Sequence, residues 1–303
     1  MRLSRRQFSA LPLAAALPAA KRSRVVIARQ AKSGYGPLLD RAMMAYFDCD
    51  DPVEPWRRLV RPGETVGLKV NCLAGKGGST SVALVEAVTE RLRQAGVAQD
   101  KIVIWDRLSE DLESAGFRPS NRGGRIRCIG NEVLGYESEL TISGSAGSLL
   151  ARTLTRLCDV VINLPVLKDH GIVGVTMALK NMFGTIHNPN KYHPNGGDPY
   201  VADVYAMPAI RKKVRLAICD AMTAQYEGGP TYMPQWCWPF GGLLVAEDPV
   251  ALDATGWRII EQKRAEMGLK PLRATGREPR YIATAAARGL GTNLAERIER
   301  LEV

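Results

Sequence analysis

The sequence predicts an α/β protein in which a mostly parallel sheet is covered by helices on both faces. Short apolar runs of strand length alternate with longer amphipathic segments of helical length, which is the pattern of such a sheet. The hydrophobic run 160–167 is typical of a strand buried on both faces. The chain has 303 residues, 46% of them hydrophobic, and no run of 18 apolar residues. We therefore expect a globular protein with no transmembrane segment.

Each element is expected where the hydrophobic period and the flanking turn residues agree. The expected strands are residues 24–28, 66–71, 101–105, 125–129, 160–164, 214–219 and 243–246. The expected helices are residues 37–47, 82–94, 149–157, 201–213 and 249–266. These elements form a single α/β domain, residues 21–303, in which segment 270–303 is expected to be a small helical appendage.

The N-terminus reads as an export signal. Arg5 and Arg6 are followed by Phe8 and then by an alanine-rich apolar stretch, residues 9–20, which is too short to span a bilayer. The alternative is an ordinary basic start before a helix. We interpret residues 1–20 as a twin-arginine signal peptide, which predicts export of the folded protein by the twin-arginine machinery to a periplasmic or other extracytoplasmic location.

Charge and cysteine spacing exclude some classes of partner. The formal net charge is +10, but no basic run is interleaved with aromatic residues, so we expect small anionic ligands and no nucleic acid. The six cysteines include no CxxC pair, so no iron–sulfur motif is present. Four of them lie in or beside predicted strands and are expected to be buried: Cys72, Cys128, Cys158 and Cys219. Cys237 lies in an aromatic loop and is expected to be more exposed.

Polar chemistry is concentrated around the strand within residues 158–187. Lys168, Asp169 and His170 are expected just past its carboxyl end, where open α/β sheets place ligands. A histidine titrates near neutrality, and a lysine can hold negative charge. We therefore treat Lys168 and His170 as candidate catalytic residues.

A short helix is expected at residues 175–183, after a glycine-containing turn, with N-terminal amides suited to an anion. Thr176 and Lys180 lie four residues apart and would share one helix face. The alternative for Lys180 is a solvated surface lysine. Its neighbours favour a catalytic role for Lys180 and substrate binding by Thr176 and Asn181.

A second group of polar residues follows the strand at residues 66–71. Lys69 and Asn71 lead into a glycine-rich loop that ends at Thr80, and the amides of such a loop can cradle a phosphate or carboxylate. The loop has neither a P-loop ending nor a GxGxxG fingerprint, so the nucleotide signal is weak. We take Lys69, Asn71 and Thr80 as candidate substrate-binding residues.

Carboxylates and a second histidine complete the candidate set. Asp106 and Asp220 each follow a predicted strand and are expected at the same edge as His170, with Asp220 as a catalytic acid or base. Asp253 lies one turn into an apolar helix, where aspartate has poor propensity. A candidate site for a divalent transition metal combines His170, His193, Asp220 and Asp253. Helix capping would explain Asp106 and Asp220 as well, and solvent exposure the loop histidine.

The ordered motifs resemble the domain of unknown function 362 family. The resemblance is carried by VINLPVLKDHG, GVTMALKNMFG, EDPVALDA, GLKVN around Lys69 and YHPN from Tyr192 to Asn195, and it covers about residues 25–291. Some members of that family carry an appended ferredoxin module, which has no counterpart in this chain. The resemblance implies a family but no mechanism.

Two classes of function fit these residues. The first is an exported enzyme acting on a small anionic substrate, metal-assisted or not, at the carboxyl edge of the sheet. The second is a periplasmic binding protein that captures an anion or a metal without catalysis. The enzyme is favoured because histidine and carboxylates add little to anion capture alone.

Overall fold

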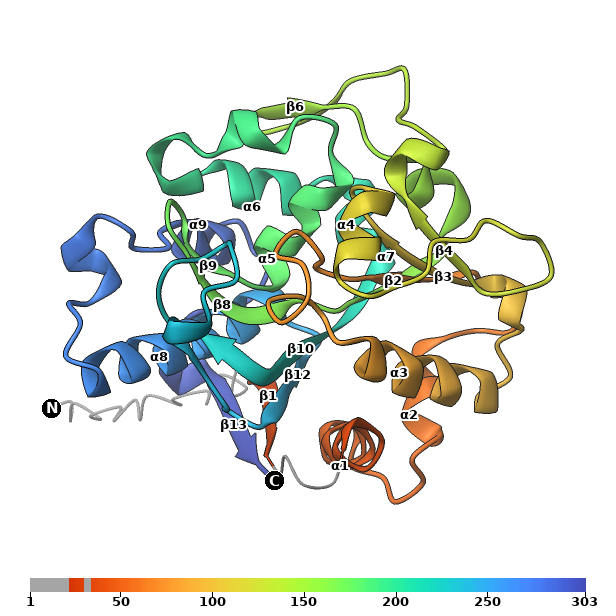
Figure 1. Cartoon of the computed structure of the whole chain (residues 1–303), viewed down its shortest axis with the longest axis horizontal. Helices are drawn as coiled ribbons and strands as arrows, with labels where there is room; N and C mark the ends of the chain where they lie inside the picture. Colours follow the sequence, from red (N-terminus) through yellow and green to blue (C-terminus); the bar gives the residue numbers. More distant parts are fainter. Residues whose placement is uncertain (1–21, 30–33) are drawn as a thin grey trace, which may run out of the picture.

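The computed structural model describes residues 22–29 and 34–303 (Figure 1). The predicted signal peptide lies outside these residues. The main sheet has eleven strands in the described part of the chain, in the order β13-β1-β12-β10-β7-β2-β3-β4; β8 and β11 also pair with β10, and β9 pairs with β8. The strands are β1 (Ser23–Arg29), β2 (Val66–Lys69), β3 (Ile102–Asp106), β4 (Arg127–Gly130), β7 (Val160–Asn163), β8 (Val166–His170), β9 (Gly174–Thr176), β10 (Val214–Gln225), β11 (Cys237–Trp238), β12 (Gly242–Ala246) and β13 (Ile298–Glu302).

The predicted fold class is confirmed. Along the main path of the sheet, β12 runs antiparallel to both of its neighbours and every other pairing is parallel. A separate hairpin joins β5 (Thr141–Ser143) and β6 (Ala146–Ser148). The helices are α1 (Tyr35–Phe47), α2 (Glu54–Leu59), α3 (Val82–Gln94), α4 (Ser109–Ser114), α5 (Ala178–Asn181), α6 (Tyr200–Tyr205), α7 (Pro208–Lys213), α8 (Pro249–Glu266) and α9 (Tyr281–Ala287).

Both faces of the sheet are covered. Successive side chains of a strand point to opposite faces, so Val160 and Ile162 join the core formed with α1 and α3. Val161 joins the other core, formed with α6 and α8. Figure 1 shows α1 and α3 on one side of the sheet and α8 on the other. The four cysteines expected to be buried are buried, and Cys237 is partly exposed.

The predicted strand at 160–167 is two strands, because proline has no N–H to donate to a ladder. Pro165 separates β7 from β8. β7 pairs with both β2 and β10. β8 continues in the same direction and still pairs with β10, but it no longer pairs with β2. The expectation that Lys168, Asp169 and His170 follow a strand is therefore wrong: they lie inside β8.

The predicted helix at 175–183 is also wrong in its first residues. Gly174–Thr176 form β9, which pairs antiparallel with β8 and sets Thr176 opposite Lys168. Only α5 and a following 3₁₀ turn, Met182–Thr185, are helical. Pairing with a neighbouring strand has overridden the local helical pattern, as it commonly does for short segments.

Further departures concern the helices and the C-terminus. The predicted helix 149–157 is wrong in its first residues, since Leu150 and Ala151 form β-bridges and the helical turn spans Thr153–Leu157. The predicted helix 201–213 is divided into α6 and α7 at Pro208. The C-terminal segment contributes α9 but ends in β13, which pairs with β1 and so belongs to the main sheet. Within residues 22–29 and 34–303, no helix combines the length and apolarity needed to cross a membrane.

Candidate functional site

A cavity of about 470 Å³ opens at the carboxyl ends of β2 and β3, beside the β8–β9 hairpin and α5. Nine residues singled out by the sequence line it: Lys69, Asn71, Asp106, Lys168, His170, Thr176, Lys180, Asn181 and His193. The structure thus brings together most of the predicted set, while the chemical roles assigned to these residues remain predictions.

The β8–β9 hairpin presents three of these side chains on one face. Residues two apart in a strand share a face, so Lys168 and His170 point to the cavity while Asp169 points away. Thr176 is directly opposite Lys168 in the antiparallel register and joins the same face. The Thr176 hydroxyl is buried and has no hydrogen-bond partner among the residues that the structure describes.

The three lysines of the cavity differ in how their ammonium groups are satisfied. Lys69 Nζ lies 2.7 Å from Asp106 Oδ1 and donates to the carbonyl of Val70 at 2.6 Å and to Asn181 Oδ1 at 3.3 Å. Lys168 Nζ donates to the carbonyl of Gly78 at 2.9 Å.

Lys180 has no hydrogen-bonding or ion-pair partner among residues 22–29 and 34–303. Its Nζ lies 4.1 Å from the ring centroid of Phe183, and the residue is only 8% exposed. Burial, reinforced by the charges of Lys168 and Lys69, lowers its pKa to about 7. Burial likewise lowers the pKa of Lys168 to about 8.

The cavity therefore carries an excess of positive charge. Lys69 is paired with Asp106, and Arg107 Nη2 lies 3.8 Å from Asp111 Oδ2. Lys168 and Lys180 have no carboxylate within ion-pair distance in the described part of the chain. Two clustered cations in a buried site cost free energy unless an anion accompanies them.

A chain of side-chain amides fixes the floor of the cavity. Asn163 Nδ2 donates to the carbonyl of Ala178, Asn181 Nδ2 donates to Asn163 Oδ1, and Asn71 Nδ2 donates to Asn181 Oδ1. Because the chain ends on a carbonyl, which can only accept, each amide orientation follows from the next one. The chain of amides leaves Asn71 Oδ1 buried and without a donor in the described part of the protein, so a ligand N–H or O–H can bind there.

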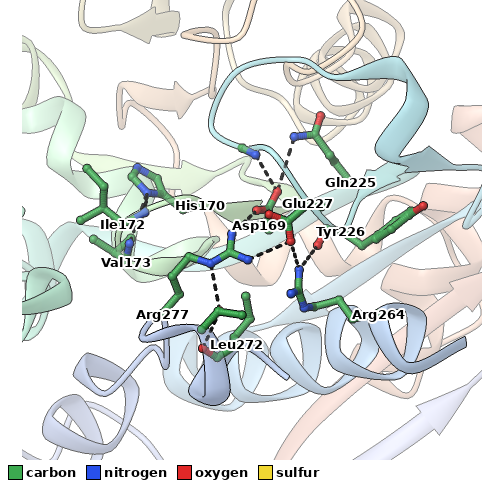
Figure 2. Close-up of polar contacts among 12 residues, drawn as sticks. Asp169, His170, Ile172, Val173, Gln225, Tyr226, Glu227, Arg264, Leu272 and Arg277 are labelled. Carbon is green, nitrogen blue, oxygen red and sulfur yellow. Dashed lines mark hydrogen bonds and ion pairs between the residues drawn. The ribbon is translucent and has the colours of Figure 1, made fainter. Parts of the chain in front are cut away.

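The two histidines present complementary nitrogens. Nδ1 of His170 accepts from the amides of Ile172 and Val173, at 3.1 and 3.3 Å, so its neutral ring carries the proton on Nε2 (Figure 2). Nδ1 of His193 lies 3.3 Å from the carbonyl of Asn190, so it donates and leaves Nε2 as an acceptor.

The histidine rings stack on each other, 5.5 Å apart between centroids. Burial and the charge of Lys180 lower the pKa of His170 to about 2, and the same causes lower the pKa of His193. Both rings are therefore neutral near pH 7, and they offer one donor and one acceptor.

An ion-pair network lies behind the hairpin and holds it in place. Asp169 accepts from the amide of Gly229 at 2.8 Å and lies 3.4 Å from Arg277. Arg277 also binds Glu227, at 2.8 Å, and Glu227 pairs in turn with Arg264. Figure 2 shows these side chains converging from β8, the loop after β10, α8 and the C-terminal segment. Segments far apart in the sequence are thereby tied to β8.

Three predicted site residues lie outside the cavity lining. Asp220 accepts from the hydroxyl of Tyr35 at 3.0 Å and from the amide of Ser81 at 2.9 Å. Thr80 donates to the carbonyl of Leu164 at 2.6 Å. The predicted convergence of Asp220 with Lys168, His170 and Lys180 is therefore wrong, because Asp220 is satisfied within the sheet-to-helix connections.

Asp253 is the third of these residues. Its carboxylate accepts from the amides of Ala178 and Leu179, at 2.7 and 3.1 Å. It thus occupies the N-terminal amides of α5 that were expected to hold a ligand anion, and it does not face the cavity. Burial raises the pKa of Asp253 to about 8, while the two amides oppose the shift.

These placements do not assemble the predicted metal site. His170 and His193 are neighbours, but Asp220 and Asp253 bind backbone amides elsewhere. Within the ranges the structure describes, no three histidine, cysteine, aspartate or glutamate residues gather as a metal site would require.

The glycine-rich loop also differs from its expected role. A Cβ on Gly77 would lie 2.7 Å from the ring of Tyr232, and one on Gly78 would lie 3.0 Å from the Cβ of that tyrosine. The glycines therefore leave room for the loop that carries Tyr232 to pack closely. The glycine-rich loop contributes one polar group beside the cavity, the carbonyl of Gly78, which accepts a hydrogen bond from Lys168.

Sequence reasoning missed several lining residues. Arg107 and Asp111 come from the turn after β3 and from α4. The wall is completed by Leu73, Ile172, Phe183, Gly184, Pro189, Asn190 and Pro230. The position of Arg107, directly after the predicted strand and Asp106, was an available signal. Pro230 lies in a long loop after β10, and loop length was the signal there, since long loops in compact domains are usually functional.

Comparison with known proteins places the chain in a family. Residues 66–258 match the family described as Domain of unknown function (DUF362). The chain belongs to this family. The resemblance seen in the motifs is thereby confirmed, and DUF362 residues 66–258 include every cavity lysine.

Two relatives of this DUF362 protein share parts of their length with it. A thylakoid-associated protein of Synechocystis sp. is 27% identical over 215 residues, which cover 67% of this chain and 65% of that protein. The chain thus matches less than two thirds of that relative. The lactate racemase apoprotein from Thermoanaerobacterium thermosaccharolyticum has a TM-score of 0.47 at 7% identity, with 78% of this chain and 57% of that chain covered. That structural likeness supports no inference about activity.

Proposed function

We propose that this protein is an exported enzyme that binds a small anionic substrate in the cavity and transfers protons on it. The observation that carries the proposal is the buried Lys180 ammonium, which faces the cavity without a partner in the described structure. Since Lys168 also lacks a counter-ion, a bound carboxylate or phosphate would neutralise both lysines.

The same groups supply acid and base chemistry near pH 7. A lysine whose pKa is lowered to about 7 can give or take a proton in that range. The acceptor Nε2 of His193 offers a second base, and Nε2–H of His170 a hydrogen-bond donor. An anion-binding protein without catalysis would need only the charges, and this supports the enzyme over the binding protein.

Calorimetric titration with inorganic phosphate, propionate and glutarate tests the binding step. We expect saturable binding by the wild type and a loss of about 1 to 3 kcal/mol in Lys180→Met, the value of a charged hydrogen bond. Lys212→Met, at an exposed position, is the matched control and should bind normally. Absence of binding by all three anions would contradict the proposal.

Catalysis is tested separately, by following exchange of carbon-bound hydrogen for deuterium in a bound ligand by NMR. An enzyme that moves protons should catalyse exchange that Lys180→Met abolishes. Tight binding with no exchange or turnover for any ligand would favour the periplasmic binding protein instead.

Export by the twin-arginine machinery is part of the same proposal, and it is supported by the sequence around Arg5 and Arg6. A periplasmic location would bring the cavity into contact with ligands that enter from outside the cell.

A further inference from the structure

We propose that Lys180 is a nucleophile that forms an imine with the carbonyl carbon of a small oxo acid. This inference rests on the proposed function, because the oxo acid is the anionic substrate of the same cavity. It adds a substrate class, an anion that carries a ketone or aldehyde, and a covalent step.

The contacts of the three lysines single out Lys180. An amine attacks a carbonyl through its lone pair, which a hydrogen-bonded ammonium does not have. Lys69 makes an ion pair with Asp106 and two further hydrogen bonds, so its terminal nitrogen is already engaged by three partners. Lys168 donates to the carbonyl of Gly78. Lys180 makes no such bond in the described residues, and its amine is free to turn toward a ligand.

The charges around Lys180 favour its neutral form. The charged groups of the cavity are the lysines at 69 and 168, Arg107, Asp106 and Asp111, and both carboxylates lie closer to other cations. Both histidines facing it are neutral near pH 7. Burial and the neighbouring lysines lower the pKa of Lys180 to about 7, and a nearby cation is a known means of activating an imine-forming lysine.

The remaining polar groups match the other parts of an oxo acid. The ammonium of Lys168 is available for the carboxylate. The unpartnered hydroxyl of Thr176 can donate to the carbonyl oxygen, and Asn71 Oδ1 can accept from the hydroxyl that replaces it. The acceptor Nε2 of His193 is suited to take the proton that the attacking amine must lose.

The step balances without an oxidant or a reductant. The lone pair of the Lys180 amine forms a C–N bond as the carbonyl π bond breaks. The oxygen takes one proton from solvent and the nitrogen loses one proton to His193, which gives a neutral carbinolamine. His193 then returns its proton to the hydroxyl, which leaves as water while the nitrogen lone pair forms the C=N bond. The product is a protonated imine between Nζ and the former carbonyl carbon, and water reverses the reaction.

Reductive trapping tests the inference on the full-length protein. The protein is incubated at neutral pH with pyruvate, 2-oxoglutarate or acetoacetate and sodium cyanoborohydride, then digested and mapped by mass spectrometry. We expect a reduced adduct on Lys180 at a level about tenfold or more above that on the exposed Lys212 for at least one oxo acid. Lys180→Arg keeps the charge, so it should still bind propionate and glutarate but form no adduct at position 180.

The outcomes separate this inference from the proposed function. If propionate or glutarate binds but no oxo acid labels Lys180 above Lys212, the imine is refuted while anion binding stands. If an oxo acid binds by calorimetry and labels another cavity lysine instead, the assignment to Lys180 is refuted. If none of these acids and no phosphate binds, both proposals fail together.

Discussion

Replacing Lys180 by methionine should make the ligand-free protein more stable, and the gain should depend on pH. Methionine has a similar length and needs no counter-ion. The substitution removes a buried charge that lies near two other lysines and has no ion-pair partner in the described residues. A lysine that supported the core through its charge would give the opposite result.

The magnitude and its sign follow from the pKa of Lys180, which is lowered from 10.5 to about 7. Below about pH 7 Lys180 is protonated in both the folded and the unfolded protein, so the folded protein bears the full free-energy cost of the buried charge. Between about pH 7 and 10.5 the unfolded state binds more protons, so the wild type gains stability as pH rises.

At about 1.4 kcal/mol per pKa unit, this cost is at most about 5 kcal/mol. Loss of the contact between Lys180 and Phe183 offsets about 1 kcal/mol of the gain. We therefore expect Lys180→Met to exceed the wild type by about 2 to 4 kcal/mol at or below neutral pH. The difference should shrink steadily toward about pH 10.

Urea unfolding of the two proteins at a series of pH values measures this difference directly. Lys212→Met, at an exposed site, controls for loss of a positive charge and should show no such trend. A variant less stable than the wild type at acidic pH, or a difference that does not change with pH, would refute the reasoning and assign Lys180 a structural role.

Three further predictions concern other parts of the molecule. Above about pH 8, where its carboxyl group is ionised, Asp253→Asn should lower the free energy of unfolding by about 1 to 3 kcal/mol, because one of two buried amides loses its acceptor; urea unfolding measures it. Replacing both Arg5 and Arg6 by lysine should abolish export, as cell fractionation would show; an unchanged periplasmic yield would contradict the signal. Cys237, which is partly exposed, should react with a thiol reagent faster than the buried Cys219; mass mapping after brief labelling checks the order.

Much of the fold follows from sequence patterns that are local. The helices α3 and α8 have the predicted bounds, because each combines a capping residue, Ser81 or Asp248, with a continuous helical segment. The strand β10 is longer than predicted, since its second half is held by β8 and β11, which come from other parts of the chain. Pairings of this kind leave no local signal.

The candidate site could be predicted where a polar residue lies in or next to a recognisable strand. Lys168 and His170 were predicted at the site because they were expected to follow a strand. They lie inside β8 instead, and both line the cavity because residues two apart in a strand share a face. Asp220 and Asp253 were misplaced because a carboxylate that accepts from backbone amides has the same local sequence as one that faces a ligand. The amide donors of Ser81 and Ala178 come from distant elements.

The lack of a partner for Lys180 does not reflect a loosely packed site. The helix that carries it is held at its first amides by Asp253 and at the carbonyl of Ala178 by Asn163. The hairpin beside it is tied down by Asp169. These contacts keep Lys180 at the cavity wall, where the described residues offer its ammonium no carboxylate. We propose that an anion entering the cavity is its partner.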